Sequence, residues 1–198
     1  MASPAIACIG VIAKQNNPLH ISLFPPGARS KLEFSFLLSS CLDIFEIRAP
    51  SKTADQDFGL LQAVDERLSM YGWLTNTGIK IIIIVDMEGR PAADNRRSVS
   101  ITGLRDADMK PVGPLRSPRS HGSWVEGEAD EMSNLQAFRA LHTAYVRLLQ
   151  NPFYSPDEHT PATANAQQRI GSTQITSKKF INEVKRIGET WVPGITSI

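Results

Sequence analysis

The run GIKIIIIVD at residues 78–86 constrains the fold most, because it places four consecutive isoleucines and a valine between Gly78 and Asp86. The run shows no alternation of polar and apolar residues, which is typical of a strand that is covered on both faces. A strand of this kind that ends in an aspartate can lie in the middle of a sheet. It can also be the magnesium-binding strand of a nucleotide-hydrolysing enzyme.

A phosphate-binding loop would decide for the enzyme, since backbone amides and a lysine must surround the phosphates. The nearest stretch is PPGARSK at residues 25–31, which lacks the second glycine and has the wrong order. Nucleotide hydrolysis is therefore disfavoured. We expect Asp86 to be a solvated residue where the strand leaves the sheet.

The residues that most often carry catalysis or bind metals are few and scattered. Cys8 and Cys41 each lie inside an apolar run, which favours buried reduced thiols and the cytosol. The histidines never occur as a pair at metal-ligand spacing. They stand at positions 20, 121, 142 and 159. We expect no catalytic residue, no metal and no cofactor, with His142 in the core and His20 touching solvent.

Apolar periodicity predicts one domain over residues 1–192 with a mixed sequence of elements. Ser30-Lys31-Leu32-Glu33 has the spacing of a capping box, so a helix starts there and fades before Pro50. The order is strand, strand, helix, three strands, helix, helix. The elements are expected at residues 5–14, 19–24, 31–49, 58–64, 68–75, 78–86, 131–150 and 180–191.

Residues 88–129 are predicted to be a long disordered insertion, and residues 151–175 a long connecting loop. The whole chain has a formal charge of +1, which leaves no field to steer it onto nucleic acid. Residues 89–121 are locally basic. The insertion is by default a solvated spacer; the alternative is weak contact with an acidic membrane surface, switched by phosphorylation at Ser100 or Ser117.

The first helix carries apolar residues on two sides. One stripe faces the core and consists of Phe34, Leu37, Leu38, Cys41, Leu42 and Phe45. At about 100° per residue, Phe36, Ser40, Asp43 and Ile47 form a line roughly opposite this stripe. The line is either a docking ridge with Phe36 and Ile47 as anchors and Asp43 as a polar contact, or scattered surface residues with Ile47 in a frayed end.

Several whole segments together resemble the sedlin-related subunits of the TRAPP tethering complex, and most closely their subunit 2-like branch. The resemblance covers residues 5–86 and 131–192. The segments that carry it are ACIGVIAKQNNPLHI, CLD at 41–43, FGLLQAVDERLSMYGWLTNTGIKIIIIVD and FRALHTAYVRLLQNPFY.

This resemblance implies an α/β (α+β) fold of the longin or SNARE-like type. That fold is a five-stranded antiparallel sheet with one helix on one face and two on the other, in the order ββαβββαα. Its fifth strand pairs with the first in the interior of the sheet. The isoleucine run would then be the partner of Ile6 to Ile12, and it would need no metal.

The resemblance also implies a non-catalytic adaptor of a TRAPP-type vesicle-tethering and Rab-activating complex in ER-to-Golgi and Golgi transport. Its partners would be other TRAPP subunits and, indirectly, a Rab GTPase, on the cytoplasmic side of ER-Golgi and Golgi membranes. Asp43 matches the aspartate of the family's S-L-D segment, which contacts partner subunits, although Cys41 departs from that pattern. The alternatives are a longin regulatory subunit of another trafficking coat or SNARE assembly, and a small enzyme.

Overall fold

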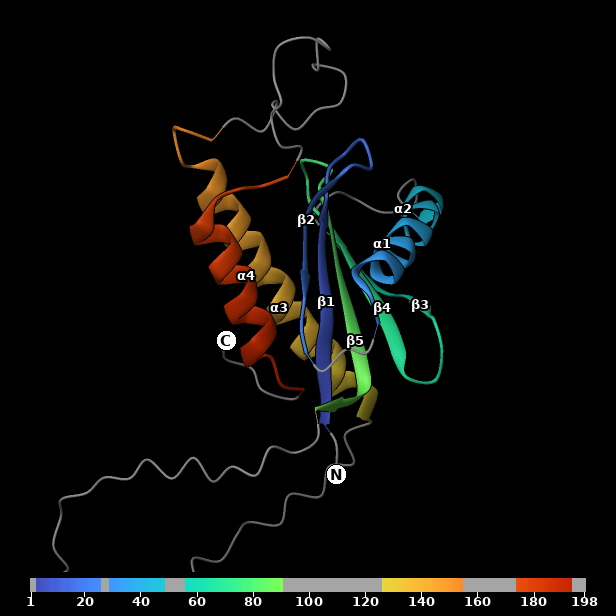
Figure 1. Ribbon diagram of the computed structural model, residues 1–198. Coiled ribbons are helices and arrows are strands. Elements are labelled where there is room, and N and C mark those ends of the chain that lie inside the picture. The colour runs from blue at the N-terminus through green and yellow to red at the C-terminus, as the bar shows by residue number, and fades with distance from the viewer. Residues whose placement is uncertain (1–2, 26–28, 49–55, 91–125, 155–173, 194–198) are drawn as a thin grey trace, which may run out of the picture.

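An antiparallel sheet of five strands lies between two helical layers in the computed structural model, which describes residues 3–25, 29–48, 56–90, 126–154 and 174–193 (Figure 1). The strands are β1 Ser3–Ile12, β2 Pro18–Leu23, β3 Gln56–Ala63, β4 Leu68–Leu74 and β5 Lys80–Arg90. They are arranged in the order β2-β1-β5-β4-β3. Helices α1 Lys31–Ser40 and α2 Leu42–Arg48 cover one face, and α3 Glu126–Leu149 and α4 Lys178–Thr190 cover the other. The predicted longin-like fold is confirmed.

Strand β5 is the central strand, with β1 on one side and β4 on the other. Its register against β1 pairs Ile81 with Val11 and Val85 with Ile6. Successive side chains of β5 point to opposite faces. Ile82 and Ile84 join the apolar cluster beneath α1 and α2, whereas Ile81, Ile83 and Val85 join the cluster beneath α3 and α4. The predicted partner of β5 and its burial on both faces are confirmed.

Two glycines on neighbouring strands let α1 and α2 approach the sheet closely. Ile82 is paired with Gly10 of β1 and with Gly72 of β4. A Cβ at Gly10 would lie 2.7 Å from a methyl group of Leu38, and one at Gly72 would lie 2.6 Å from the ring of Phe45. The two glycines therefore leave the space that these helical side chains fill.

The first helix begins as predicted, with the Glu33 amide donating to Ser30 Oγ at 3.3 Å and the Ser30 amide donating to the Glu33 carboxylate at 2.7 Å. It differs from the prediction in being interrupted at Cys41, between α1 and α2. The carbonyl oxygen of Leu37 accepts bonds from the Cys41 amide at 3.3 Å, Cys41 Sγ at 3.2 Å and Ser40 Oγ at 2.8 Å. Side chains that bond back to carbonyls in this way bend helices.

The ends of the expected insertion are ordered in this structure, since β5 continues to Arg90 and α3 begins at Glu126. Residues 91–125, which include Ser100 and Ser117, lie outside the described residues, as do residues 155–173 of the expected connecting loop. The division into one domain over 1–192 with an insertion within 88–129 stays a prediction.

Asp86 corrects an expectation, because it is buried and bonded instead of solvated. Its carboxylate receives two hydrogen bonds from the Arg67 guanidinium, at 2.7 and 2.8 Å, and further bonds from the amides of Glu88 and Gly89. Burial on its own raises the pKa of Asp86, but the bonds from Arg67 and from these amides outweigh it and lower the pKa. Asp86 thereby joins β5 to the turn between β3 and β4.

The close approach of Leu38 to Gly10 predicts that Gly10→Ala lowers stability. The alanine restricts the unfolded chain, which raises the free energy of unfolding by about 0.4–1 kcal/mol. Its methyl group overpacks against Leu38, however, which lowers the free energy of unfolding by about 1–3 kcal/mol. Urea unfolding measures the net loss. Leu38→Ala on its own should cost about 2–5 kcal/mol. The loss of stability in the double variant should be smaller than the sum of the two single losses, because the added methyl group at position 10 no longer clashes with a leucine at position 38. A loss equal to that sum would contradict this packing.

Because Asp86 forms an ion pair, Asp86→Asn should lower the free energy of unfolding by about 2 kcal/mol at pH 7, and this loss should depend on pH. Since the folded-state pKa is lowered, the stabilisation is present above the unfolded pKa of about 4 and is lost as pH falls through the folded-state pKa. Urea unfolding from pH 7 to pH 3 should show the gap to wild type narrowing. Glu88→Gln, which removes an exposed partner of Arg67, should cost less than about 0.5 kcal/mol.

Candidate functional site

The outer face of α1 and α2 carries the four residues that the sequence places on one line. Phe36 is 66% exposed and Ile47 is 77% exposed, and Ser40 and Asp43 are exposed as well. The core stripe of the same helices lies beneath them, with Phe34, Leu38, Cys41 and Phe45 buried. The exposure agrees with the line predicted from helical geometry, although the two anchors now lie on separate helices.

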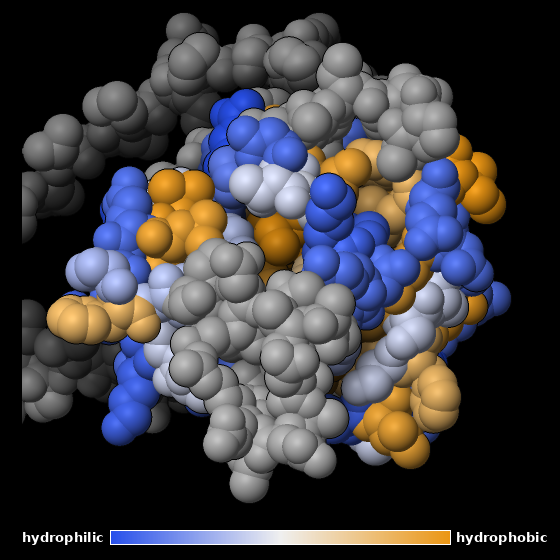
Figure 2. Space-filling model, turned by 90° about the horizontal axis from the view of Figure 1, so that it is seen from above, coloured by the Kyte–Doolittle hydropathy of each residue, from blue (hydrophilic) through white to orange (hydrophobic). Residues whose placement is uncertain are grey.

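Sequence reasoning missed one residue of this face. Leu32 is 65% exposed and precedes Phe36 by four residues, so the two lie one turn apart on α1. Its spacing from Phe36 was the signal that could have found it. Seen from above, apolar side chains reach the outer edge on the side of α1 and α2, among hydrophilic ones (Figure 2). We call Leu32, Phe36, Ser40, Asp43 and Ile47 the outer ridge.

The ridge is held in place at its far end. Helix α2 extends to Arg48, so Ile47 lies in the last turn of this helix. The Arg48 guanidinium donates to the carbonyl oxygens of Phe58, Leu60 and Leu61 of β3, at 3.3, 2.9 and 3.4 Å. These bonds fasten the end of α2 to the edge strand of the sheet.

The polar members of the ridge have local roles of their own. Ser40 Oγ donates to the carbonyl of Leu37 at 2.8 Å. Asp43 lies in the first turn of α2, where a carboxylate is stabilised by the helix dipole. The side chain of Asp43 is exposed, so it also remains accessible to a partner.

The two cysteines are buried thiols that are not activated as nucleophiles. Both are free and buried, as predicted. Burial raises the pKa of Cys8 to about 12, and burial also raises the pKa of Cys41 to about 12. Cys41 Sγ lies 3.2 Å from the sulfur of Met70 in the core. A thiol with such a pKa keeps its proton at neutral pH, so neither group is an activated nucleophile.

His20 reaches solvent as expected, whereas His142 differs from the expectation. His20 is half-buried, bonded to Ser22 Oγ at 2.7 Å and edge-on to the ring of Phe180. Burial, and then the charges of Lys31 and Lys185, lower the pKa of His20. His142 is half-buried and not in the core, while His121 and His159 lie outside the described residues. Among the described side chains, no three histidines, cysteines or carboxylates gather into a group that could hold a metal ion.

A membrane-crossing helix is likewise not found among the described residues, because none of their helices is both long and apolar enough.

Comparison with known proteins finds a matching family model and several similar proteins. The model of a family described as Sedlin matches residues 11–190. A protein of Mus musculus named trafficking protein particle complex subunit 2-like protein is 29% identical over 176 residues, which cover 86% of this chain and 94% of the relative. Proteins of the same name from Dictyostelium discoideum and Xenopus tropicalis are 26% identical over 187 residues and 28% identical over 157 residues. These alignments cover 92% and 76% of this chain, and 95% and 84% of the relatives.

Proposed function

This chain belongs to the Sedlin family, and from that membership we propose that it is a non-catalytic adaptor subunit of a TRAPP-type complex that tethers vesicles and activates a Rab GTPase. Relatives that match over most of their length are named as subunits of the trafficking protein particle complex. The proposed setting is ER-to-Golgi and Golgi transport, on the cytoplasmic side of those membranes. The Rab GTPase is served indirectly, through other subunits.

The outer ridge is the proposed docking surface for a neighbouring subunit. The observation that supports it most is the exposure of Phe36 and Ile47 on helices whose opposite side is already buried against the sheet. Large apolar side chains that serve no internal packing lose contact with water only in a complex. Aromatic anchors of this kind contribute much of the affinity of protein interfaces.

The ridge is also prepared for binding, because both ends of its helical support are fixed. The capping box at Ser30 and Glu33 fixes the start of α1, and the bonds from Arg48 fix the end of α2. A surface that is already in its bound shape loses less conformational freedom on association.

Phe36→Ser combined with Ile47→Ser should weaken partner binding by at least about 30-fold, since truncated anchors cost about 2 kcal/mol or more. Both side chains are exposed, so thermal unfolding should be almost unchanged. The measurement is affinity purification of the full chain from cells, followed by mass spectrometry of the recovered subunits.

Val146→Ser is the matched control, because Val146 is an exposed apolar residue of α3 on the other side of the sheet. It should recover the same subunits as wild type. Unchanged recovery by the double variant would refute the ridge as the docking surface. Recovery of a coat or SNARE assembly without TRAPP subunits would refute the assignment to a TRAPP-type complex.

Asp43→Asn should separate the two roles of this carboxylate. Loss of its charge from the first turn of α2 should cost at most about 1 kcal/mol of stability, whereas loss of a charged interface contact should weaken partner binding by about 2 kcal/mol or more. Quantitative recovery of subunits and urea unfolding measure the two effects. Glu66→Gln is the control, because it removes an equal charge from an exposed position. It should change neither the recovery of subunits nor the stability. An equal effect of both variants on recovery would contradict a specific role for Asp43.

A further inference from the structure

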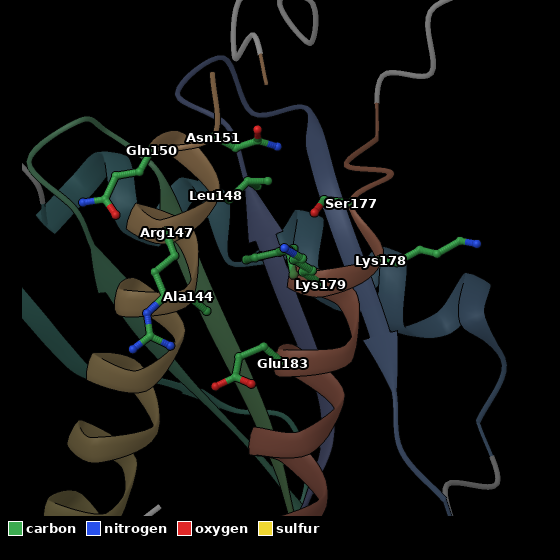
Figure 3. Close-up of a pocket in the computed structure, with 10 residues that line it drawn as sticks. Ala144, Arg147, Leu148, Gln150, Asn151, Ser177, Lys178, Lys179 and Glu183 are labelled. Atoms are coloured by element: carbon green, nitrogen blue, oxygen red, sulfur yellow. The ribbon is translucent and has the colours of Figure 1, made fainter. Parts of the chain in front are cut away.

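A groove of about 680 Å³ opens between the end of α3 and the start of α4, on the opposite face of the sheet from the outer ridge (Figure 3). Its basic side chains are Arg147 from α3 and Lys178 and Lys179 from α4. Lys178 extends away from the groove, whereas Lys179 lies over it. The amide side chains of Gln150 and Asn151 stand at the same end.

The one carboxylate that lines the groove is already neutralised. Glu183 points from α4 toward α3, and its two oxygens accept hydrogen bonds from Arg186 at 2.9 and 3.2 Å. Arg147 and Lys179 form no ion pair within the part of the chain that the structure describes. The bonds from Arg186 lower the pKa of Glu183, and Arg147 also lies close enough to help lower it. Among the described lining residues there are three cations for this single carboxylate, so the groove has an excess of positive charge.

The position of the two lysines contradicts the usual preference of helices. Cations are unfavourable in the first turn, where the helix dipole is positive, and acidic residues are the common choice there. Helix α4 has no acidic residue in its first turn, and the side chain of Ser177 makes no capping bond. Local choices that cost stability in this way are expected at functional sites. A bound anion would offset the cost.

An exposed aromatic ring stands beside this groove. Phe153 is 95% exposed and follows two residues after Asn151, which lines the groove. The side chain of Asn151 accepts a hydrogen bond from the Phe153 amide at 3.2 Å, and its carbonyl accepts one from the Tyr154 amide at 3.0 Å. These bonds form an ordered turn that holds the ring outward.

We propose that this end of the molecule binds the phosphate groups of anionic phospholipids, with Arg147 and Lys179 contacting the headgroup and Phe153 entering the membrane interface. Basic side chains that lie beside an exposed aromatic residue are the pattern of peripheral membrane contact, since the cations meet phosphate while the ring leaves water. A soluble phosphate would use the cations but would leave Phe153 without a role. The combination therefore favours a lipid surface.

The test is flotation of the full chain with phosphatidylserine-containing phosphatidylcholine vesicles and with phosphatidylcholine vesicles alone. Wild type should bind only the anionic vesicles. Each basic side chain near an anionic leaflet changes partitioning about fivefold, so Arg147→Gln with Lys179→Gln should reduce binding about 25-fold. Phe153→Ser should reduce it by about tenfold or more, because it removes the apolar contribution.

The control is Lys31→Gln with Arg139→Gln, which removes the same two charges from exposed positions outside the groove. It should bind like wild type, and all variants should keep the wild-type thermal unfolding. An equal loss in both double variants, or no binding by wild type, would overturn the proposal. So would binding of inositol hexakisphosphate, measured by calorimetry, in a chain that floats with neither vesicle.

Discussion

Burial of β5 on both of its faces is the constraint on which the rest of the structure depends. A central strand of isoleucines must be covered by helices on each side, so the sheet separates two apolar clusters that do not mix. Gly10 and Gly72 flank Ile82 and allow α1 and α2 to lie close on one side. That close seating buries Phe34, Leu38, Cys41 and Phe45 of the core stripe and leaves Leu37 and Leu42 partly buried. The opposite stripe is then left facing solvent, and the outer ridge is the consequence of it.

Features that depend on local periodicity could be predicted from the sequence. The core stripe of the first helix, its capping box and the partner of β5 follow from spacing and from a resemblance of whole segments. Asp86 could not be placed in this way, because its partner Arg67 belongs to a turn 19 residues earlier that meets this part of β5 only in the folded sheet. The interruption at Cys41 was missed for another reason: it depends on hydroxyl and thiol groups competing for the carbonyl of Leu37.

The same distinction applies to the candidate sites. A ridge along neighbouring turns is visible in the sequence, because residues three and four apart share one side of a helix. The groove is not visible there, since its cations come from two helices with 30 residues or more between Arg147 and Lys178 or Lys179. Only the two lysines at the start of α4 gave a local signal, because positive charges are unusual in the first turn of a helix. Deviation from a local preference was therefore the one indication that the sequence alone contained.

The two surfaces are compatible in one assembly because the sheet lies between them. The outer ridge faces away from β5 on the α1–α2 side, and the groove lies at the far end of the α3–α4 layer. Sites that share no side chain and lie this far apart contribute independently to binding. Docking of a partner on α1 and α2 would leave Arg147, Lys179 and Phe153 free to meet a membrane. A chain of this architecture could in this way join a protein assembly and a lipid surface at the same time, and the sheet fixes the geometry between the two sites.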